Sequence, residues 1–185
     1  MAYVGVRKPY VAPFGATAGT YLTPIAFGKA TTFEETPNVA EATLYGDDAL
    51  AESERGITSA ALSVGITHIP DAAIEPMFGH QTSEGETISD IDDAAGYCGF
   101  AVIGVKKVDG VRSYEARVYP KTQWSEPSTS LQTRGESTEF QTPSAEGTAL
   151  PDDNGVWRYI ESFSTEAAAI SYITSKFPTR AEEHT

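Results

Sequence analysis

The alternation of apolar and polar residues along the chain predicts a protein built mainly of β-strands. The clearest element is a hairpin in which Phe100 to Val108 passes through Asp109-Gly110 into Val111 to Tyr119. Asp-Gly between two β-prone runs is a strong hairpin signal, because a type I′ turn needs positive φ at both central residues. Side chains of the return strand alternate, which predicts one apolar face and one face in water. The apolar set is Tyr114, Ala116 and Val118, and the polar set is Ser113, Glu115 and Arg117.

Other segments carry weaker strand patterns. Gly56 to Ile66 follows a mostly period-2 pattern. The remaining candidates are Thr20 to Ala30, Val39 to Tyr45, Glu136 to Thr142, and a strand after the Asn154-Gly155 turn that contains Trp157, Tyr159 and Phe163. Three polar stretches are predicted to be irregular, and these are Gly46 to Gly56, Gln123 to Arg134 and Thr142 to Asn154.

Two segments carry helix signals. The first is Ser164 to Lys176, where Ser164 is a candidate cap and Pro178 follows the end. Its predicted apolar stripe is Phe163, Ala167, Ile170, Ile173 and Phe177. A second, short helix is predicted from Ala72 to Phe78, although Pro76 would interrupt it.

The length and composition are those of one folded domain. The chain has 185 residues, 40% of them hydrophobic, and a formal net charge of -13. Such an acidic chain is not expected to bind the phosphates of a nucleic acid. The charges are also segregated, since 30–54 and 71–93 contain acids and no Lys or Arg, whereas 106–121 is mostly basic. Blocks of opposite sign on one chain suit head-to-tail association of copies.

Targeting signals and membrane spans are absent from the sequence pattern. No apolar run approaches the length of about 20 residues that a membrane helix needs. The N-terminal segment has no signal-peptide pattern. We therefore expect the protein to be made and kept in a cytoplasm, unless it leaves as part of a larger particle.

Candidate chemistry is sparse. A Cys98–His80 pair is the alternative for thiol catalysis, but the apolar surroundings of Cys98 favour a place in the core. Two acidic patches are candidates for metal binding. The first is Asp90, Asp92 and Asp93, and the second is Asp152, Asp153 and Asn154. Turn chemistry explains both, because the ligand spacing of a calcium loop is missing. We expect no enzyme activity, no metal and no cofactor.

Three further segments resemble one protein family. They are LYGDDALAES (Leu44 to Ser53), IGVKKVDGVRSYEARVYPKTQWSEPS (Ile103 to Ser128) and TRGESTEFQTPSAEG (Thr133 to Gly147). In this order, and with the N-terminal segment that follows Tyr3, they resemble the major tail proteins of long-tailed, non-contractile bacteriophages and prophages of Gram-positive bacteria. The resemblance runs along most of the chain.

The resemblance implies a tail tube protein. Its fold would be a mainly antiparallel β-sandwich or barrel with a flanking α-helix, a long inter-strand loop and extended terminal arms. Copies would form hexameric rings that stack into the tail tube, through which DNA passes into the host. In this chain, a single domain would span 1–185, residues 45–56 would be the stacking loop, and 1–14 and 163–185 would be the arms. The helix near Pro76 is normally uninterrupted in that family, so Pro76 puts its length in question here.

The resemblance also implies partners and contact residues. The loop residues expected to contact the next ring are Asp47, Asp48, Glu52, Glu54 and Arg55. The complementary basic residues, chosen by charge sign, are Lys106, Lys107, Arg112 and Arg117. Family partners are the tape measure protein, the tail terminator and the baseplate or distal tail proteins. Genomic DNA would pass without specific binding, and the protein would reside in the virion tail, having assembled in the host cytoplasm.

Two other function classes stay open at this point. One is a β-rich adaptor or another tube or tail-completion component of a phage tail or a related secretion machine, because fold alone does not separate these. The other is an enzyme whose site gathers residues distant in sequence. A tube protein should self-associate to a degree that depends on protein or salt concentration, whereas an adaptor or an enzyme should form a defined small oligomer.

Overall fold

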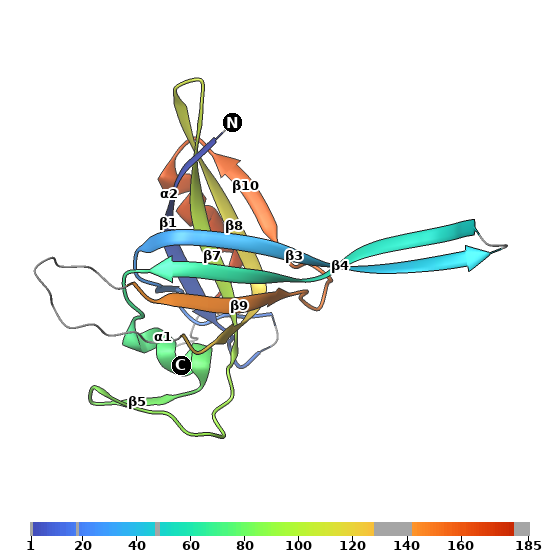
Figure 1. The fold of residues 1–185 in the computed structure, drawn as a ribbon. Helices are drawn as coiled ribbons and strands as arrows, with labels where there is room; N and C mark the ends of the chain where they lie inside the picture. Colours follow the sequence, from blue (N-terminus) through green and yellow to red (C-terminus); the bar gives the residue numbers. More distant parts are fainter. Residues whose placement is uncertain (1, 18, 47–48, 128–141, 180–185) are drawn as a thin grey trace, which may run out of the picture.

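The computed structural model describes residues 2–17, 19–46, 49–127 and 142–179, and over 42–46 and 49–54 it describes the backbone alone. Strands dominate, and the prediction of a mainly antiparallel β fold with a flanking helix is confirmed (Figure 1). The strands are β1 (Ala2–Pro13), β2 (Ile25–Ala26), β3 (Ala30–Gly46), β4 (Ala49–Ile66), β5 (Gln81–Ser83), β6 (Glu86–Ile88), β7 (Tyr97–Val108), β8 (Val111–Ser125), β9 (Ser144–Leu150) and β10 (Tyr159–Phe163). The helices are α1 (Asp71–Phe78) and α2 (Glu166–Lys176).

Eight strands form one sheet in the order β2-β1-β7-β8-β9-β4-β3, with β10 added beside β8. The long strand β8 serves two partners, because β10 pairs with 114–118 and β9 pairs with 121–125. All these pairings are antiparallel, and β5 and β6 form a separate two-stranded sheet.

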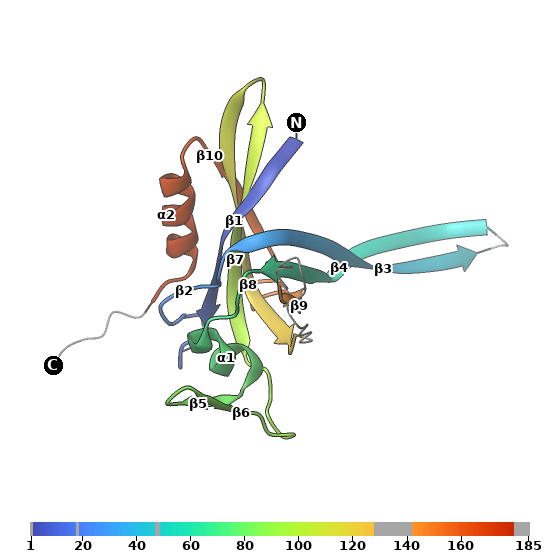
Figure 2. The same ribbon diagram turned by 60° about the vertical axis from the view of Figure 1, so that its left-hand side comes forward.

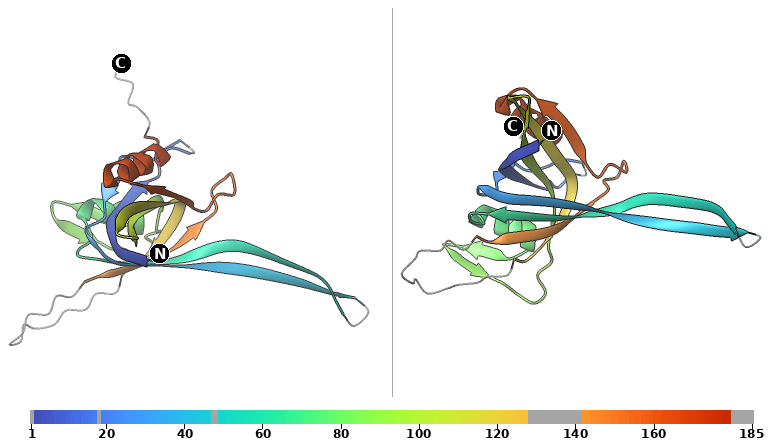
Figure 3. Two further views of the ribbon diagram at one scale, coloured as in Figure 1. Left: turned by 90° about the horizontal axis from the view of Figure 1, so that it is seen from above. Right: turned by 45° about the horizontal axis from the view of Figure 1, so that its top comes forward.

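The main sheet curls so that β3, at one end of the strand order, crosses close to β1 near the other end (Figures 1 and 3). The concave side encloses the larger apolar core, which includes Phe27, Phe100, Tyr119 and Trp124. Helix α1 packs on this core through Met77 and its neighbours. Pro76 lies inside α1 without ending it, so the expected interruption is wrong and the helix runs from Asp71 to Phe78.

Helix α2 covers the opposite face of β1, β7, β8 and β10 (Figure 2). Its N-cap is Thr165, one residue after the predicted Ser164, and the Thr165 side chain accepts from the backbone N–H of Ala168. Ile173 and Phe177 are buried as predicted, but Ala167 is exposed and Ala169 takes its place in the contact. The predicted stripe was therefore wrong at one position.

The β7–β8 hairpin confirms the turn prediction. Asp109 has φ of 48° and Gly110 has φ of 86°, as a type I′ turn requires. The prediction that the polar face of β8 lies in water is wrong, because Glu115 is only 3% exposed. That face points to the concave side of the curled sheet, where charged partners from other strands meet it.

Four segments predicted to be irregular or a terminal arm contain strands. The described residues within 45–56 are strand and not loop, because Tyr45 and Gly46 end β3 and 49–56 belong to β4, paired from Gly46 and Ala49 inward. Residues 2–13 are not an arm, because β1 lies inside the sheet between β2 and β7. Strand β9 occupies part of 142–154, and β8 continues through Ser125.

The remaining predictions have mixed outcomes. Within 20–30, the described strand residues are Ile25 and Ala26 of β2 and Ala30, where β3 begins. At the C-terminal end, 163–179 packs on the body through α2, which leaves no extended arm in the described part. Residues 128–141, with most of the predicted strand 136–142, and residues 180–185 lie outside the described part of the chain.

Candidate assembly surfaces

A two-stranded ribbon projects from the body, and we call residues 38–57 of β3 and β4 the arm (Figure 1). Strand β4 pairs with β9 only from Ala60 to Gly65, so beyond that point β3 and β4 have each other as their sheet partners. The register shifts between Asn38 and Val39, where the arm leaves the body. Such a bulge bends a strand and increases its twist. The arm therefore leaves the body as a paired ribbon, with the bulge at the point where it leaves.

The described side chains of the arm are solvent-exposed. Val39 and Ile57 are cross-strand partners and are 56% and 46% exposed. Arg55 forms an ion pair with Glu41 on the opposite strand at 2.9 Å. Isolated two-stranded hairpins are marginally stable in water. The described part of the arm therefore has little packing within the subunit to stabilise it.

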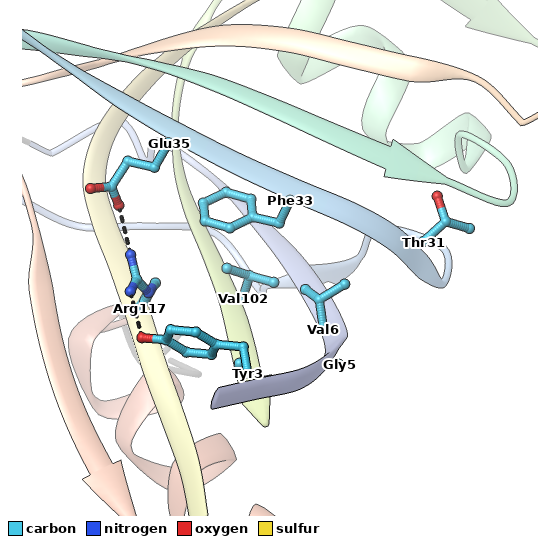
Figure 4. A pocket seen from close by; sticks show the side chains of 9 residues that line it. Tyr3, Gly5, Val6, Thr31, Phe33, Glu35, Val102 and Arg117 are labelled. Atoms are coloured by element: carbon cyan, nitrogen blue, oxygen red, sulfur yellow. Dashed lines mark hydrogen bonds and ion pairs between the residues drawn. The ribbon is translucent and has the colours of Figure 1, made fainter. Parts of the chain in front are cut away.

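Two sheet edges that the described strands leave largely unpaired face each other at the base of the arm. Strand β3 ends the strand order, and β2 covers β1 only at Tyr10 and Val11. Between these edges lies an open cavity of about 370 Å³ (Figure 4). It is lined by Tyr3, Gly5 and Val6 of β1, Thr31, Phe33 and Glu35 of β3, Val102 and Gly104 of β7, and Arg117 of β8. The curled sheet is therefore left open along one seam.

The wall of this cavity contains a network of buried charges. Arg117 donates to Glu35 at 3.1 Å, to Glu115 at 2.8 Å and to the Tyr3 hydroxyl at 2.8 Å. The Tyr3 hydroxyl donates in turn to Glu115 at 2.7 Å. Figure 4 shows Arg117 between Glu35 and Tyr3, which come from different strands. One guanidinium thus joins β1, β3 and β8.

Three more residues complete the network. Arg158 and Tyr119 both donate to Glu35, and Lys106 donates to Glu115. The two carboxylate side chains are only 7% and 5% exposed. Removing one partner of a buried ion pair leaves an uncompensated charge and is strongly destabilising. The network therefore holds the arm base of β3 against β8 and the start of β10.

The network shifts the acidity of its members. Burial acts to raise the pKa of Tyr3, but hydrogen bonds and positive charges of Arg117 and Lys106 outweigh burial, so this pKa is lowered. The pKa of Tyr119 is raised, first by burial and then by the Glu35 carboxylate. Burial acts to lower the pKa of Arg117, yet Tyr3, Tyr119 and Glu35 raise it on balance. Arg117 therefore stays charged.

A second polar cluster lies at the end of the body that carries α1 and the β5–β6 hairpin. The His80 ring is nearly buried, its Nδ1 lies 2.7 Å from Asp93 Oδ2, and its Nε2 lies 3.6 Å from Glu126 Oε1. Asp93 also accepts the backbone N–H of Asp90 at 2.8 Å. The pKa of Asp93 is lowered, first by this backbone hydrogen bond and then by His80. The cluster fixes the turn before β7.

The acidic patches have the predicted turn role. Asp90 accepts the backbone N–H of Asp92, and Asp152 accepts those of Asn154 and Val156. Across the described residues, no group of three or more His, Cys, Asp or Glu side chains is arranged to hold a metal ion. Cys98 is fully buried beside Thr122, as predicted for a core residue, and burial raises the pKa of its thiol to about 11.

The structure separates the predicted contact residues. Asp47 and Asp48 lie outside the described residues, and Glu52 and Glu54 lie on β4 with only their backbone described. Arg55 pairs with Glu41 within the arm. Among the basic residues expected to contact another copy, Lys106 and Arg117 form ion pairs inside the subunit. Lys107 and Arg112 are exposed and lie opposite each other near the β7–β8 turn.

The acidic half of the buried network could not be recognised from the sequence. Glu35 was interpreted only as part of an acidic block, and Glu115 as a residue in water. Arg158 and Tyr3 carried no signal that linked them to either carboxylate. One sequence signal could have indicated buried charges. Lys106, Glu115 and Arg117 alternate with apolar residues on two adjacent strands that are otherwise largely buried.

Comparisons with known proteins place few limits on this chain. No protein-family model matches it, and no curated protein matches it. Among solved structures, one chain of the anti-feeding prophage baseplate is similar over 88% of this chain and 96% of that chain, with 8% identity and a TM-score of 0.30. Similarity at this level does not establish a shared function. Within the described residues, no helix is long and apolar enough to cross a membrane.

Proposed function

We propose that this protein is a structural virion subunit of a long-tailed, non-contractile phage that assembles with copies of itself into stacked hexameric rings forming the tail tube. The observation that carries the proposal is the arm. A ribbon with exposed Val39 and Ile57 extends beyond the support of β9. A partner copy would supply the packing that this ribbon lacks.

The free edges of the sheet support the same proposal. An unpaired edge strand is an aggregation hazard in a monomer and a ready joint in an assembly. Among the described strands, β3 has 17 residues and pairs along one edge, with β4. The register of β1 against β7 shifts twice, and Lys8 has φ of 48°. These irregularities make the edge of β1 a poorer partner for another strand. We infer that copies associate along β3 and the arm.

The charge supports a conduit for DNA. A net charge of -13 gives the assembled wall a negative potential that repels a phosphate backbone, so DNA would pass without specific binding. In this proposal the tape measure protein would occupy the tube during assembly. The tail terminator and the baseplate or distal tail proteins would contact its ends.

Negative-stain electron microscopy over a series of protein and salt concentrations tests the proposal. We expect rings or hollow tubes of uniform width from the wild-type chain. The double variant Val39→Lys with Ile57→Lys should remain dispersed, because it places charges on the exposed apolar pair of the arm. The control Leu22→Lys changes a similarly exposed apolar residue, 55% exposed, outside the arm and should assemble like the wild type.

Sedimentation velocity on the same samples separates the alternatives. A wild-type chain that stays monomeric at every concentration, also when tail-tip proteins that initiate assembly are supplied, contradicts the proposal. A defined small oligomer that does not change with concentration would favour the adaptor or tail-completion role.

A further inference from the structure

The β7–β8 turn carries an exposed basic and apolar surface, which we call the tip and define as Lys107, Val108, Val111 and Arg112. Val111 is 70% exposed and Val108 is 37% exposed, and the two are cross-strand partners. Figures 1 and 2 place this turn at one end of the body. The tip is thus free to contact another molecule.

The tip contains an unfavourable pair within the subunit. Lys107 of β7 lies directly opposite Arg112 of β8. Like charges at opposed strand positions destabilise a sheet. In the described part of the chain neither Lys107 nor Arg112 forms an ion pair. An anionic surface from outside the subunit would relieve this repulsion.

The opposite end of the body carries an acidic and apolar surface, which we call the base and define as Glu84, Glu86, Ile88, Asp90, Ile91 and Asp92. Residues 71–93 contain no Lys or Arg. Ile91 is 98% exposed and Ile88 is 54% exposed. Burial of such exposed apolar side chains in a contact with another molecule is favourable.

The base is held in a defined shape. Asp90 and Asp93 each accept a backbone N–H within this turn, and Asp93 is bound by His80. Ile91 is therefore presented by a fixed turn. A pre-organised surface binds with a smaller loss of conformational entropy.

We propose that the tip of one copy docks on the base of the next copy. Strand β7 begins beside the base and ends at the tip, so displacement of a copy along this strand brings the two surfaces together. The contact is heterologous and repeats without closing, which lengthens an assembly in one direction. This inference rests on the proposed self-assembly and names a contact that does not involve the arm.

Charge exchange between two variants tests the contact. The first variant is Lys107→Glu with Arg112→Glu, and the second is Glu86→Lys with Asp92→Lys. Glu86 and Asp92 are exposed, whereas Asp90 and Asp93 hold the turn through their side chains and are left unchanged. Each variant alone faces like charge at every contact, and we expect the concentration needed for assembly to rise about tenfold.

An equal mixture of the two variants is the decisive sample. In an alternating assembly, the acidic tip of the first variant meets the basic base of the second, and the unchanged surfaces meet each other. We therefore expect the mixture to assemble at close to the wild-type concentration. The single changes Lys29→Glu and Asp153→Lys, on exposed residues outside both surfaces, serve as charge controls and should assemble normally.

The outcomes distinguish this contact from self-assembly itself. If the wild type assembles and either double variant assembles equally well, the tip–base contact is wrong and self-assembly stands. If both variants lose assembly and the mixture does not regain it, the two surfaces do not meet each other. If the wild type never assembles, the proposed function fails and this contact fails with it.

A cross-link covers the case in which a charge variant misfolds. Val111→Cys and Ile91→Cys change exposed residues, and the natural Cys98 is fully buried. Mild oxidation of the mixed assembly should give a covalent dimer, and neither variant alone should give it. Assembly without this dimer would overturn the contact.

Discussion

Glu35 of β3 and Arg117 of β8 lie 82 residues apart in the sequence, and their side chains form an ion pair with a nitrogen–oxygen distance of 3.1 Å. Glu35 lies three residues before the arm begins, and its carboxylate also accepts from Arg158 and Tyr119. A single carboxylate thus fixes the base of the arm to β8 and to the residue that precedes β10. The direction of the arm, and any contact that it makes, depends on this anchor.

Replacing Glu35 by Gln should destabilise the subunit. The change removes the negative charge that faces Arg117 and Arg158, whose side chains are 20% and 27% exposed. Breaking a buried ion pair costs several kcal/mol, and partial exposure of the two arginines reduces that, so we expect a loss of about 2 to 4 kcal/mol. Urea denaturation measures the free energy of unfolding.

Glu34→Gln is the matched control for this measurement. Glu34 is the preceding residue on the same strand and is exposed. Exposed surface substitutions usually change stability by less than about 0.5 kcal/mol. Equal stability losses in the two variants would mean that the network does not hold the arm base.

Gly99→Ala should loosen the contact between α2 and the sheet. A methyl group at Gly99 of β7 would overlap the aromatic ring of Phe177, which follows α2. Overpacking of this kind costs typically about 1 to 3 kcal/mol. Gly5→Ala is the control, because a methyl group at Gly5 of β1 would meet nothing within 4 Å.

A double variant makes the Gly99 prediction specific. Phe177→Leu removes the ring edge that the new methyl group would meet, so Gly99→Ala should cost less in that background than in the wild type. The coupling free energy from the double-mutant cycle measures this. Strictly additive losses would show that the two residues do not interact.

Local signals in the sequence predicted the local structure well. Asp109-Gly110 specifies its turn through two backbone conformations, and the run that ends in Lys176 specifies a helix through its cap and apolar spacing. Each of these signals lies within a few residues of the element that it determines. The strand-rich class and the buried position of Cys98 could be predicted for the same reason.

Long-range pairing could not be predicted in this way. Residues 45–56 are polar and acidic, which is typical of a loop, but strand pairing is decided by backbone hydrogen bonds to a partner segment. Glu35 and Arg158 lie 123 residues apart, and no local pattern joins them. For the candidate site, charge sign alone selected Lys107 and Arg112 together with Lys106 and Arg117, and only the fold separates exposed cations from buried ones.

Cys98 should be inert in the native protein. Its thiol is fully buried, its Sγ lies 3.6 Å from Thr122 Oγ1, and burial raises its pKa to about 11. Thiol reagents need both access and the thiolate. We expect labelling to proceed only through opening of the fold, so Glu35→Gln should accelerate it and Glu34→Gln should not. Rapid labelling of the native wild type would contradict the burial of Cys98.

Tyr21 should make the protein sensitive to alkaline pH. Its hydroxyl donates to the carbonyl of Pro120 at 2.9 Å, and burial, followed by Asp152 and Tyr159, raises its pKa from 10.0 to about 12. The folded state therefore favours the neutral phenol. The stabilisation is fully present below pH 10 and is lost as the pH rises towards 12, with a slope of about 1.4 kcal/mol per pH unit from this group.

Tyr21→Phe separates this effect from general alkaline unfolding. The variant lacks the ionisable group, so its free energy of unfolding should fall less steeply between pH 10 and 12 than that of the wild type. Tyr119, whose pKa is also raised, keeps part of the slope in both proteins. At neutral pH the variant loses one buried hydrogen bond, at a cost of about 1 kcal/mol. Urea denaturation at stepped pH measures both quantities, and parallel curves for the two proteins would show that the Tyr21 phenol does not control alkaline stability.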